Sequence, residues 1–380
     1  AELRHFSDAH YALAENLKAQ QQMLGQDHPQ VATTLTAIGT VHKQQRHFSE
    51  AFTCFESALR IREKHHGRNH RLSAECWNHM GDVRKAEDPP RLQEALEYYQ
   101  KALAIDKRNE GQSAHMAEDL LQIGSVHSKT GDVRKALQAH KESSKINQHC
   151  FGKDDPEVAK GLISIGDVYR QLGQLQKALV YFEQGFQVLQ LNSIENAEMS
   201  NVMTAIGEIK QKMGQELEAL RLFKRALVID RGLHGESHPD CARNMYNIGT
   251  IRQHEKKLEE SLHFLQQAYD IRLRILGHNH PSVADTVFMI GHNFRLEGKM
   301  DEALKNYQDA IRAFKTTQGH ELDVAKVLRS IGFVYEHKHD WGQAVKNHRE
   351  NLRILQLVWG VKDKRVKKAE EILNKAIRSA

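Results

Sequence analysis

The segment Gly235-Glu-Ser-His-Pro239-Asp-Cys-Ala-Arg-Asn-Met245-Tyr-Asn-Ile248-Gly249 contains the features that recur along this chain. A glycine-to-proline link leads into an amphipathic run that ends in an apolar residue followed by glycine. The same apolar–glycine pair occurs eight times, with its glycine at positions 39, 81, 124, 166, 207, 249, 291 and 332. Successive glycines are 41 to 43 residues apart. Such regular spacing indicates tandem structural repeats rather than separate globular domains.

Each repeat glycine lies inside a helical pattern. An apolar residue precedes it by four positions, as Met245 precedes Gly249, and the residues just before it and two after it complete an i, i+3, i+6 stripe. We therefore expect an amphipathic helix, named helix A, in every repeat. A glycine in mid-helix costs about 1 kcal/mol relative to alanine. Its recurrence predicts that a neighbouring helix approaches closely at this point.

A second amphipathic segment, helix B, follows each helix A. Small residues stand 12 and 19 positions after most of the repeat glycines, with a bulky residue between them, as in Ala219, Phe223 and Ala226. The bulky residues are Phe55, Tyr99, His140, Phe182, Phe223, Leu265, Tyr307 and His348. We expect the small residues to meet helix A and the bulky one to fill the core.

The repeats predict three regions. Residues 1–27 match helix B alone and are interpreted as an N-terminal half-repeat, which suggests a segment cut from a longer protein. Residues 28–360 contain eight tandem repeats, and residues 361–380 predict one basic helix that caps the last apolar face. In the second repeat, Ala86-Glu-Asp-Pro-Pro90 lengthens the turn between the helices by two residues.

Composition and motifs argue against several functions. The net charge of +5 is small for 380 residues and does not indicate nucleic-acid binding. No apolar run approaches the roughly 18 residues that cross a bilayer, so no membrane association is expected. The chain has no nucleophile elbow, phosphate-binding glycine loop or H-E-x-x-H motif, so we expect neither an enzyme nor a cofactor.

Cysteines and histidines do not predict a metal centre either. Cys54, Cys76, Cys150 and Cys241 are far apart and form no C-x-x-C pair, which favours a reducing, cytoplasmic compartment. The histidine clusters, such as His278 and His280, recur in the G-x-x-H-P links between repeats. A structural role in those loops is therefore preferred to metal binding.

The glycine and alanine positions around a bulky residue resemble the tetratricopeptide repeat. The longer period and the G-x-x-H-P link resemble the 42-residue version found in kinesin light chains and nephrocystin-like scaffolds. The paired asparagines of kinesin light chain repeats have only partial counterparts here, Asn78-His79 and Tyr246-Asn247. The resemblance implies an all-α, right-handed superhelical solenoid of about eight helix pairs, whose A helices line a concave groove.

A groove lined by A helices would hold a basic ladder. A basic or potentially basic residue follows every repeat glycine by four or five positions: Lys43, Lys85, Lys129, Arg170, Lys212, His254, Arg295 and His337. Lys and Arg donors in a concave site favour an extended acidic or C-terminally carboxylated ligand. The helix macrodipole also favours cations in a last helical turn, so a purely structural explanation of the ladder stays open.

Other groove positions vary between repeats. Acids gather in the second, fourth and fifth repeats, amides could bind a ligand backbone, and aromatic residues toward the C-terminal end predict either apolar pockets or core. The candidate peptide-binding residues are Lys43, Asn78, Lys85, Gln122, Lys129, Asp167, Arg170, Asn201, Glu208, Arg243, Tyr246, Asn247, Phe288, His292, Arg295 and Arg329.

The leading functional hypothesis is a protein-interaction module, an adaptor or scaffold that binds an extended acidic or mixed acidic and hydrophobic partner segment in its groove. The alternative is a rigid structural or autoinhibitory arm of a larger multidomain signalling protein. Neither hypothesis requires a metal, a cofactor, a nucleic acid or a membrane. The oligomeric state and the identity of the partner stay open.

Overall fold

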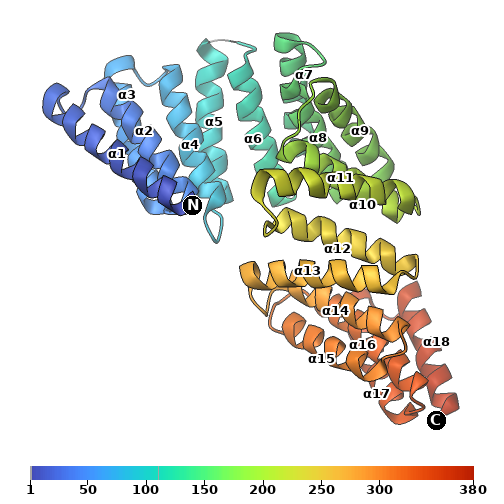
Figure 1. The fold of residues 1–380 in the computed structure, drawn as a ribbon. Helices are drawn as coiled ribbons and strands as arrows, with labels where there is room; N and C mark the ends of the chain where they lie inside the picture. Colours follow the sequence, from blue (N-terminus) through green and yellow to red (C-terminus); the bar gives the residue numbers. More distant parts are fainter. Residues whose placement is uncertain (1, 110) are drawn as a thin grey trace. The chain divides into compact units, whose positions relative to one another are not determined.

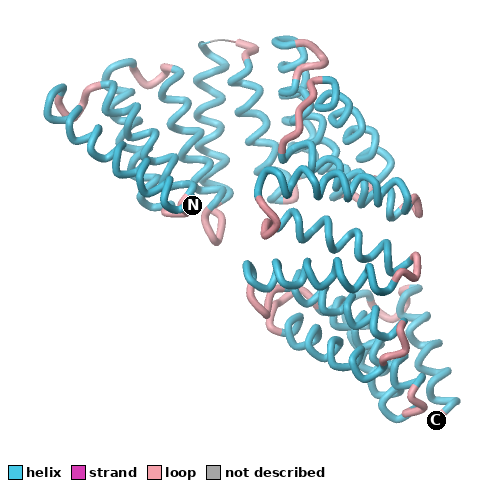
Figure 2. Tube along the Cα trace, viewed as in Figure 1, coloured by secondary structure: helices cyan, strands magenta, loops and turns pink. Residues whose placement is uncertain are grey.

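The computed structural model describes residues 2–109 and 111–380, with side chains described from Tyr11 onward. These residues form helices joined by short loops, as Figure 2 shows. Figure 1 labels the eighteen helices of the described residues. The first nine are α1 (Glu2–Leu24), α2 (Pro29–Gln44), α3 (Phe48–His66), α4 (Arg71–Ala86), α5 (Leu92–Asn109), α6 (Ala114–Thr130), α7 (Val133–Phe151), α8 (Pro156–Gln171) and α9 (Leu175–Leu191). The others are α10 (Ala197–Lys212), α11 (Glu216–His234), α12 (Pro239–His254), α13 (Leu258–Leu276), α14 (Pro281–Leu296), α15 (Met300–Lys315), α16 (Glu321–His337), α17 (Trp341–Trp359) and α18 (Lys364–Ser379).

Consecutive helices pack as pairs. Each A helix, such as α12, packs along the B helix that follows it, α13, and α13 packs in turn on the next A helix, α14. Neighbouring A helices also touch, as α12 and α14 do. This arrangement confirms the predicted all-α architecture of repeated helix pairs.

The helices fall into two compact units, a division that the repeat pattern does not predict. Unit 1 contains α1–α9 and ends at Ile194, and unit 2 contains α10–α18 and begins at Glu195. The segment Leu191-Asn-Ser-Ile-Glu-Asn196 at the division has neither glycine nor proline. The sequence-based division into residues 1–27, 28–360 and 361–380 stays a prediction.

The repeat glycines are contact points between the two helices of a pair. A Cβ atom added to Gly207 would lie 2.7 Å from the ring of Phe223, and one added to Gly39 would lie 2.8 Å from the ring of Phe55. The same contact occurs in the pairs Gly39–Phe55, Gly81–Tyr99, Gly124–His140, Gly166–Phe182, Gly207–Phe223, Gly249–Leu265, Gly291–Tyr307 and Gly332–His348. The predicted close approach is thus confirmed, and its partner is the bulky residue of helix B.

Histidines of the repeat links cap the A helices. In four links the Nδ1 atom accepts a hydrogen bond from the backbone N–H two residues later, at 3.1–3.3 Å, and these histidines are His28, His70, His238 and His280. Three of them precede a proline at the first helical position, which needs no hydrogen-bond acceptor there. The cap satisfies a donor that would otherwise lack a partner.

Three repeats have a non-glycine residue with positive φ in the turn from helix A to helix B. Gly131, Gly173, Gly214 and Gly298 have φ between 70° and 81°. At the same offset Arg46, Lys256 and His339 have φ of 64°, 60° and 57°. The turn geometry is therefore conserved between repeats even where the side chain makes it unfavourable, because helix packing dictates it.

The glycine contact predicts opposite effects of alanine at two helical glycines of unit 2. Gly207→Ala should destabilise unit 2 by about 1–3 kcal/mol, because the new methyl group overlaps the Phe223 ring. Gly232→Ala is the matched control, since nothing lies within 4 Å of its Cβ position, and it should stabilise α11 by up to about 1 kcal/mol. Urea unfolding followed by Trp341 and Trp359 fluorescence, in a Trp77→Phe background, measures both. If both substitutions changed the free energy of unfolding equally, the contact between Gly207 and Phe223 would not be the cause.

His140 predicts an acid-dependent loss of stability in unit 1. Its ring is buried at a position that Phe occupies in three other repeats, and burial lowers the pKa of His140 from 6.5 to about 4. The neutral ring therefore stabilises the folded state above pH 6.5, and this stability is lost as the pH falls toward 4. The loss amounts to roughly 3 kcal/mol.

His140→Phe should remove this acid sensitivity. The measurement is urea unfolding at pH 7 and pH 4.5, in a background where Trp341 and Trp359 are phenylalanine so that Trp77 reports on unit 1. The difference between variant and wild type should grow on acidification, because Phe carries no titratable group. Parallel pH profiles for the two proteins would exclude His140 as the cause.

Candidate functional site

Three lysines of the predicted ladder lie on successive A helices of unit 1. Lys43 on α2 forms an ion pair of 2.8 Å with Asp82 on α4. Lys85 on α4 is half-buried and donates a hydrogen bond to Gln122 on α6. Lys129, near the end of α6, is exposed. Each lysine at this offset thus lies on a different A helix, and two of them already bind a residue of the next repeat.

Lys85 is the most perturbed of these cations. Burial lowers the pKa of Lys85, and the nearby cations Lys129 and Lys43 lower it further, although Asp82 opposes them. Its ammonium also lies 5.5 Å from the centre of the Tyr99 ring. The three lysines are therefore close enough to repel one another, and Lys85 would gain from an added negative charge.

A polar cleft of about 1160 Å³ lies beside these lysines in unit 1. It is formed by the link before α4, by α4 itself, by the end of α5 and by the first half of α6. Its lining contains His66, Gly67, Arg68, Asn69, His70, Arg71, Leu72, Glu75, Asn78, His79, Asp82, Asp106, Asn109, His115, Glu118 and Gln122. Asn78 and Gln122 are predicted site residues that the structure places in this cleft.

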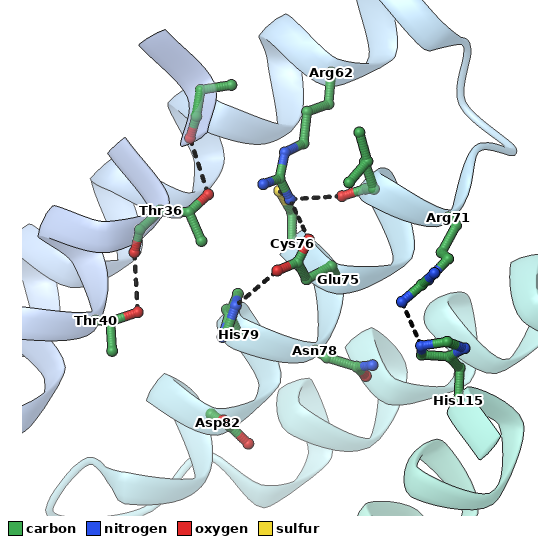
Figure 3. A network of polar contacts seen from close by, with 12 residues as sticks. Thr36, Thr40, Arg62, Arg71, Glu75, Cys76, Asn78, His79, Asp82 and His115 are labelled. Carbon is green, nitrogen blue, oxygen red and sulfur yellow. Dashed lines mark hydrogen bonds and ion pairs between the residues drawn. The ribbon is translucent and has the colours of Figure 1, made fainter. Parts of the chain in front are cut away.

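Charged side chains hold the walls of the cleft in place (Figure 3). The buried guanidinium of Arg62 donates to the Leu72 carbonyl at 2.9 Å, to Glu75 at 3.0 Å and to the Cys76 thiol at 3.3 Å. Hydrogen bonding from His79 lowers the pKa of Glu75. Sequence reasoning did not select Arg62 or Glu75. Arg62 nevertheless recurs in the repeat as Arg272, whose guanidinium donates to the Ser282 carbonyl at 3.0 Å, so this offset carried a signal.

Two buried aspartates meet beside the cleft, and Asp106 is part of its lining. Asn78 donates a hydrogen bond of 2.6 Å to Asp119, and Asp106 approaches Asp119 from α5. Asp119 and Asp106 are both almost fully buried. Burial raises the pKa of Asp119 to about 8, and Asp106 adds to this effect while Asn78 opposes it. At neutral pH the pair therefore retains a proton.

The same three positions form a network with a single carboxyl group in unit 2. Thr204 donates to the Asn244 carbonyl oxygen at 2.9 Å, and the Asn244 amide donates to Asp230 at 2.8 Å. Thr204, Asn244 and Asp230 correspond in the repeat to Asn78, Asp119 and Asp106. We name this three-residue contact between repeats the polar junction. A polar residue five positions before a repeat glycine, such as Asp119, is the sequence signal for it.

Predicted site residues of unit 2 are largely engaged with one another. Arg243 donates to Asn201 at 2.6 Å and approaches Asp240 at 3.2 Å. The Tyr246 hydroxyl donates to Asp285, and the Arg272 guanidinium lies 4.6 Å from the centre of the Tyr246 ring. These contacts bring Asn201, Arg243 and Tyr246 onto adjacent A helices, as the repeat offsets predict.

Toward the end of unit 2, basic groups remain accessible. Arg295 lies 2.6 Å from the half-buried ring of His292. Burial lowers the pKa of His292 to about 4, and Arg295 contributes to this shift. Arg329 is exposed on α16. The neutral His292 can thus accept a hydrogen bond from Arg295.

Two predicted binding residues lie in the core instead of a groove. Phe288 is only 4% exposed and packs 5.5 Å from the Tyr307 ring, so it fills the space between α14 and α15. Met289, which the aromatic pocket would have included, is also buried. Asn247 is buried and its amide group is covered. The helical stripe places these side chains against helix B, and they present too little surface for a ligand.

The two acidic candidates, Asp167 and Glu208, differ in their surroundings. Asp167 forms an ion pair of 2.7 Å with Arg170, three residues later on α8. Glu208 on α10 is half-buried. The pairing of Asp167 with Arg170 means that this ladder cation is neutralised within its own helix, so the basic edge is weaker than its sequence pattern suggests.

Cofactor and membrane features were sought in the described residues. No group of three or more His, Cys, Asp or Glu side chains there is placed to hold a metal ion. The four cysteines are free thiols. Among the helices described, none is both long and apolar enough to span a bilayer.

Sequence comparison identifies the repeat. Two profiles described as tetratricopeptide repeat match the chain, one at residues 31–72 and the other at residues 91–149, 115–190, 198–273 and 243–316. Together the matches of the second profile span more than half of the chain. A search of curated proteins with this chain found no matching sequence.

Solved structures of similar fold come from several proteins. The apo form of the quorum sensor NprR from B. thuringiensis is 14% identical, with a TM-score of 0.62 over 81% of this chain and 83% of that one. BtubC (BKLC) from P. vanneervenii is 18% identical, with a TM-score of 0.52 over 60% of this chain and 92% of that one. A Rap protein complexed with Competence and Sporulation Factor is 16% identical, with a TM-score of 0.53 over 93% and 100%. These likenesses concern the fold.

The polar junctions predict an effect of Asp119→Asn on stability. Because the folded-state pKa of Asp119 is raised to about 8, its stabilising neutral form is fully present below the usual pKa of 3.8 and is lost as the pH rises toward 8. Asparagine at position 119 would match Asn244 of unit 2, and its amide needs no added proton to donate a hydrogen bond to Asp106. Asp119→Asn should therefore stabilise unit 1 by about 5 kcal/mol at pH 8 and by much less at pH 4.

The reverse substitution in unit 2 is the matched control. Asn244→Asp should create a carboxyl pair with Asp230 and destabilise unit 2 increasingly as the pH rises. Urea unfolding of both variants between pH 4 and pH 8, with tryptophan fluorescence assigned to each unit, measures the effect. If Asp119→Asn destabilised the protein at every pH, the protonated pair would be refuted.

Proposed function

Because the chain belongs to the tetratricopeptide repeat family, whose members generally serve as protein-interaction modules, we propose that it acts by binding rather than by catalysis. The finer proposal is that unit 1 holds an extended segment of a partner protein across the A helices α2, α4 and α6. An acidic side chain of that segment lies at Lys85 and Lys129. Its backbone occupies the polar cleft.

The arrangement of Lys43, Lys85 and Lys129 is the observation that carries this proposal. Asp82 neutralises Lys43, but the repulsion at Lys85 persists, because burial and Lys129 both disfavour its charge. A carboxylate from a ligand would stabilise the charged form of Lys85 and could form a charge-assisted hydrogen bond. Lys129 is exposed at the same edge and can contact the same group.

The cleft supports an extended backbone rather than a compact ligand. Its volume of about 1160 Å³ is at the upper end of ordinary ligand pockets. Gln122 accepts from Lys85 and donates to Glu118 at 2.7 Å, so both ends of its amide can be redirected to a peptide N–H or C=O. Amide contacts to backbone hold a segment without dictating its sequence.

Unit 2 offers a second set of candidate contacts. Asn201, Arg243 and Tyr246 lie together, and His292, Arg295 and Arg329 are at least partly accessible farther along the A helices. Phe288 and Asn247 are left out because they are buried. The apolar part of a mixed partner would instead meet Phe333, which is 39% exposed on α16.

We place the protein in a reducing, cytoplasmic compartment. Cys54, Cys76, Cys150 and Cys241 are free thiols, and the fold is complete without a disulfide between them. Burial raises the pKa of Cys76 and of Cys241 to about 11, so neither thiol is reactive at neutral pH. These cysteines support packing rather than cross-linking.

Short fluorescent peptides with alternating Glu and Leu, Gln and Leu or Lys and Leu test the proposal by anisotropy at two salt concentrations. The Glu–Leu peptide should bind best and weaken with salt. Lys85→Glu and Lys129→Glu should each reduce its affinity by roughly tenfold, because each reverses a charge at the contact. Lys141→Glu, an exposed charge reversal on the B helix α7, is the matched control and should have little effect.

Two results would overturn this assignment. Equal affinity for all three peptides would mean that the lysines do not select an acidic partner. Equal losses in Lys85→Glu, Lys129→Glu and Lys141→Glu would show a response to net charge alone, without a site on α4 and α6. Thermal unfolding of each variant separates loss of binding from loss of the fold.

A further inference from the structure

The turn between α17 and α18 exposes apolar side chains. Leu357 is 73% exposed, Val361 is 66% exposed and Val358 is 44% exposed, and all three lie within five residues. Trp359 stands between them, with the Arg365 guanidinium 3.4 Å from the centre of its ring. Residues Leu357–Lys368 are named the α17–α18 tip. These three apolar side chains take no part in the binding site proposed for unit 1.

The position of the tip, rather than a missing neighbour, accounts for this exposure. Val358 corresponds in the repeat to Leu233 and Ile275, which are 45% and 46% exposed although further helix pairs follow them. Side chains at this offset therefore point away from the helix stack. Where the tip has Leu357 and Val361, the repeat ending in α13 has the polar residues Arg274 and His278.

Cations surround the apolar residues of the tip. Four of its lysines are exposed, at positions 362, 364, 367 and 368. The one acid among them, Asp363, caps α18 and binds Arg365 at 2.9 Å, so its charge is already matched. The corresponding links 235–239 and 277–281 contain no lysine.

Helix stability does not explain these cations. The first turn of α18 has no acidic residue and is instead basic, although the helix macrodipole favours anions at that end. Lys364, Lys367 and Lys368 therefore lie at the helix end that disfavours cations, and Glu370 and Glu371 are the acids that follow them on α18. Exposed apolar side chains next to four exposed lysines form an amphipathic surface of the kind that meets a lipid interface.

We propose that the α17–α18 tip docks on an anionic phospholipid membrane. Leu357, Val358 and Val361 enter the boundary between headgroups and acyl chains, and the lysines contact the anionic headgroups. Apolar side chains beside four exposed lysines match the two layers of an anionic lipid surface, an apolar interior beneath charged headgroups. Sequence reasoning predicted no membrane partner because it considered spanning helices, whereas a peripheral contact needs only a short apolar tip.

Vesicle cosedimentation of the full chain tests this proposal. The protein should bind phosphatidylcholine vesicles that contain about one-third phosphatidylserine, release them at high salt, and ignore vesicles of phosphatidylcholine alone. In a background with Trp77→Phe and Trp341→Phe, Trp359 emission should shift to shorter wavelength on binding, because its surroundings become less polar. The shift reports on the tip itself.

Paired variants identify the residues responsible. Leu357→Ser with Val361→Ser, and separately Lys362→Glu with Lys364→Glu, should each lower the vesicle partition coefficient by about tenfold or more. Leu233→Ser with Ile275→Ser is the matched control, because these exposed apolar residues lie on turns without lysine, and it should leave binding unchanged. Circular dichroism confirms that every variant folds.

Three outcomes would overturn the proposal. The first is no binding to the phosphatidylserine vesicles, and the second is binding that both tip variants retain. The third is binding to polyglutamate that both tip variants lose, without any vesicle binding, which would assign the tip to an acidic protein. The peptide assay on unit 1 is independent of all three, because its variants lie on α4 and α6.

Discussion

The contact between a repeat glycine and a bulky side chain of helix B sets the geometry of every helix pair. Gly207 against Phe223 and Gly332 against His348 are the same contact with different side chains. Helix A accepts an unfavourable residue in its middle so that a ring can lie on its backbone. This contact places the inner face of helix B against helix A. The opposite face of helix A is then available for other contacts.

Contacts between successive repeats are less uniform than contacts within them. At the polar junctions the same three positions hold Asn78, Asp119 and Asp106 in unit 1 but Thr204, Asn244 and Asp230 in unit 2. The first set needs a proton and the second does not. Because a junction holds no ring against a glycine, its side chains can change while the repeat geometry persists. The candidate cleft lies at such a junction.

Electrostatics decides which part of a long repeat array can bind. The ladder of cations recurs in every repeat, yet ion pairs such as Lys43–Asp82 and Asp167–Arg170 neutralise much of it. Lys85 and Lys129 keep a positive character that a ligand can use. The α17–α18 tip follows the same logic, because its lysines exceed the acids beside them. Both sites that we propose are argued from charge that lacks local compensation.

The sequence by itself determined the all-α repeat architecture, because the glycine period, the amphipathic stripes and the G-x-x-H-P links are local patterns with one physical solution. Only the tertiary structure decided that Phe288 and Asn247 are core, that Lys43 is paired, and that Asp106 meets Asp119. Burial and ion pairing depend on which side chains of neighbouring helices meet, and the repeat offsets alone do not give those pairings.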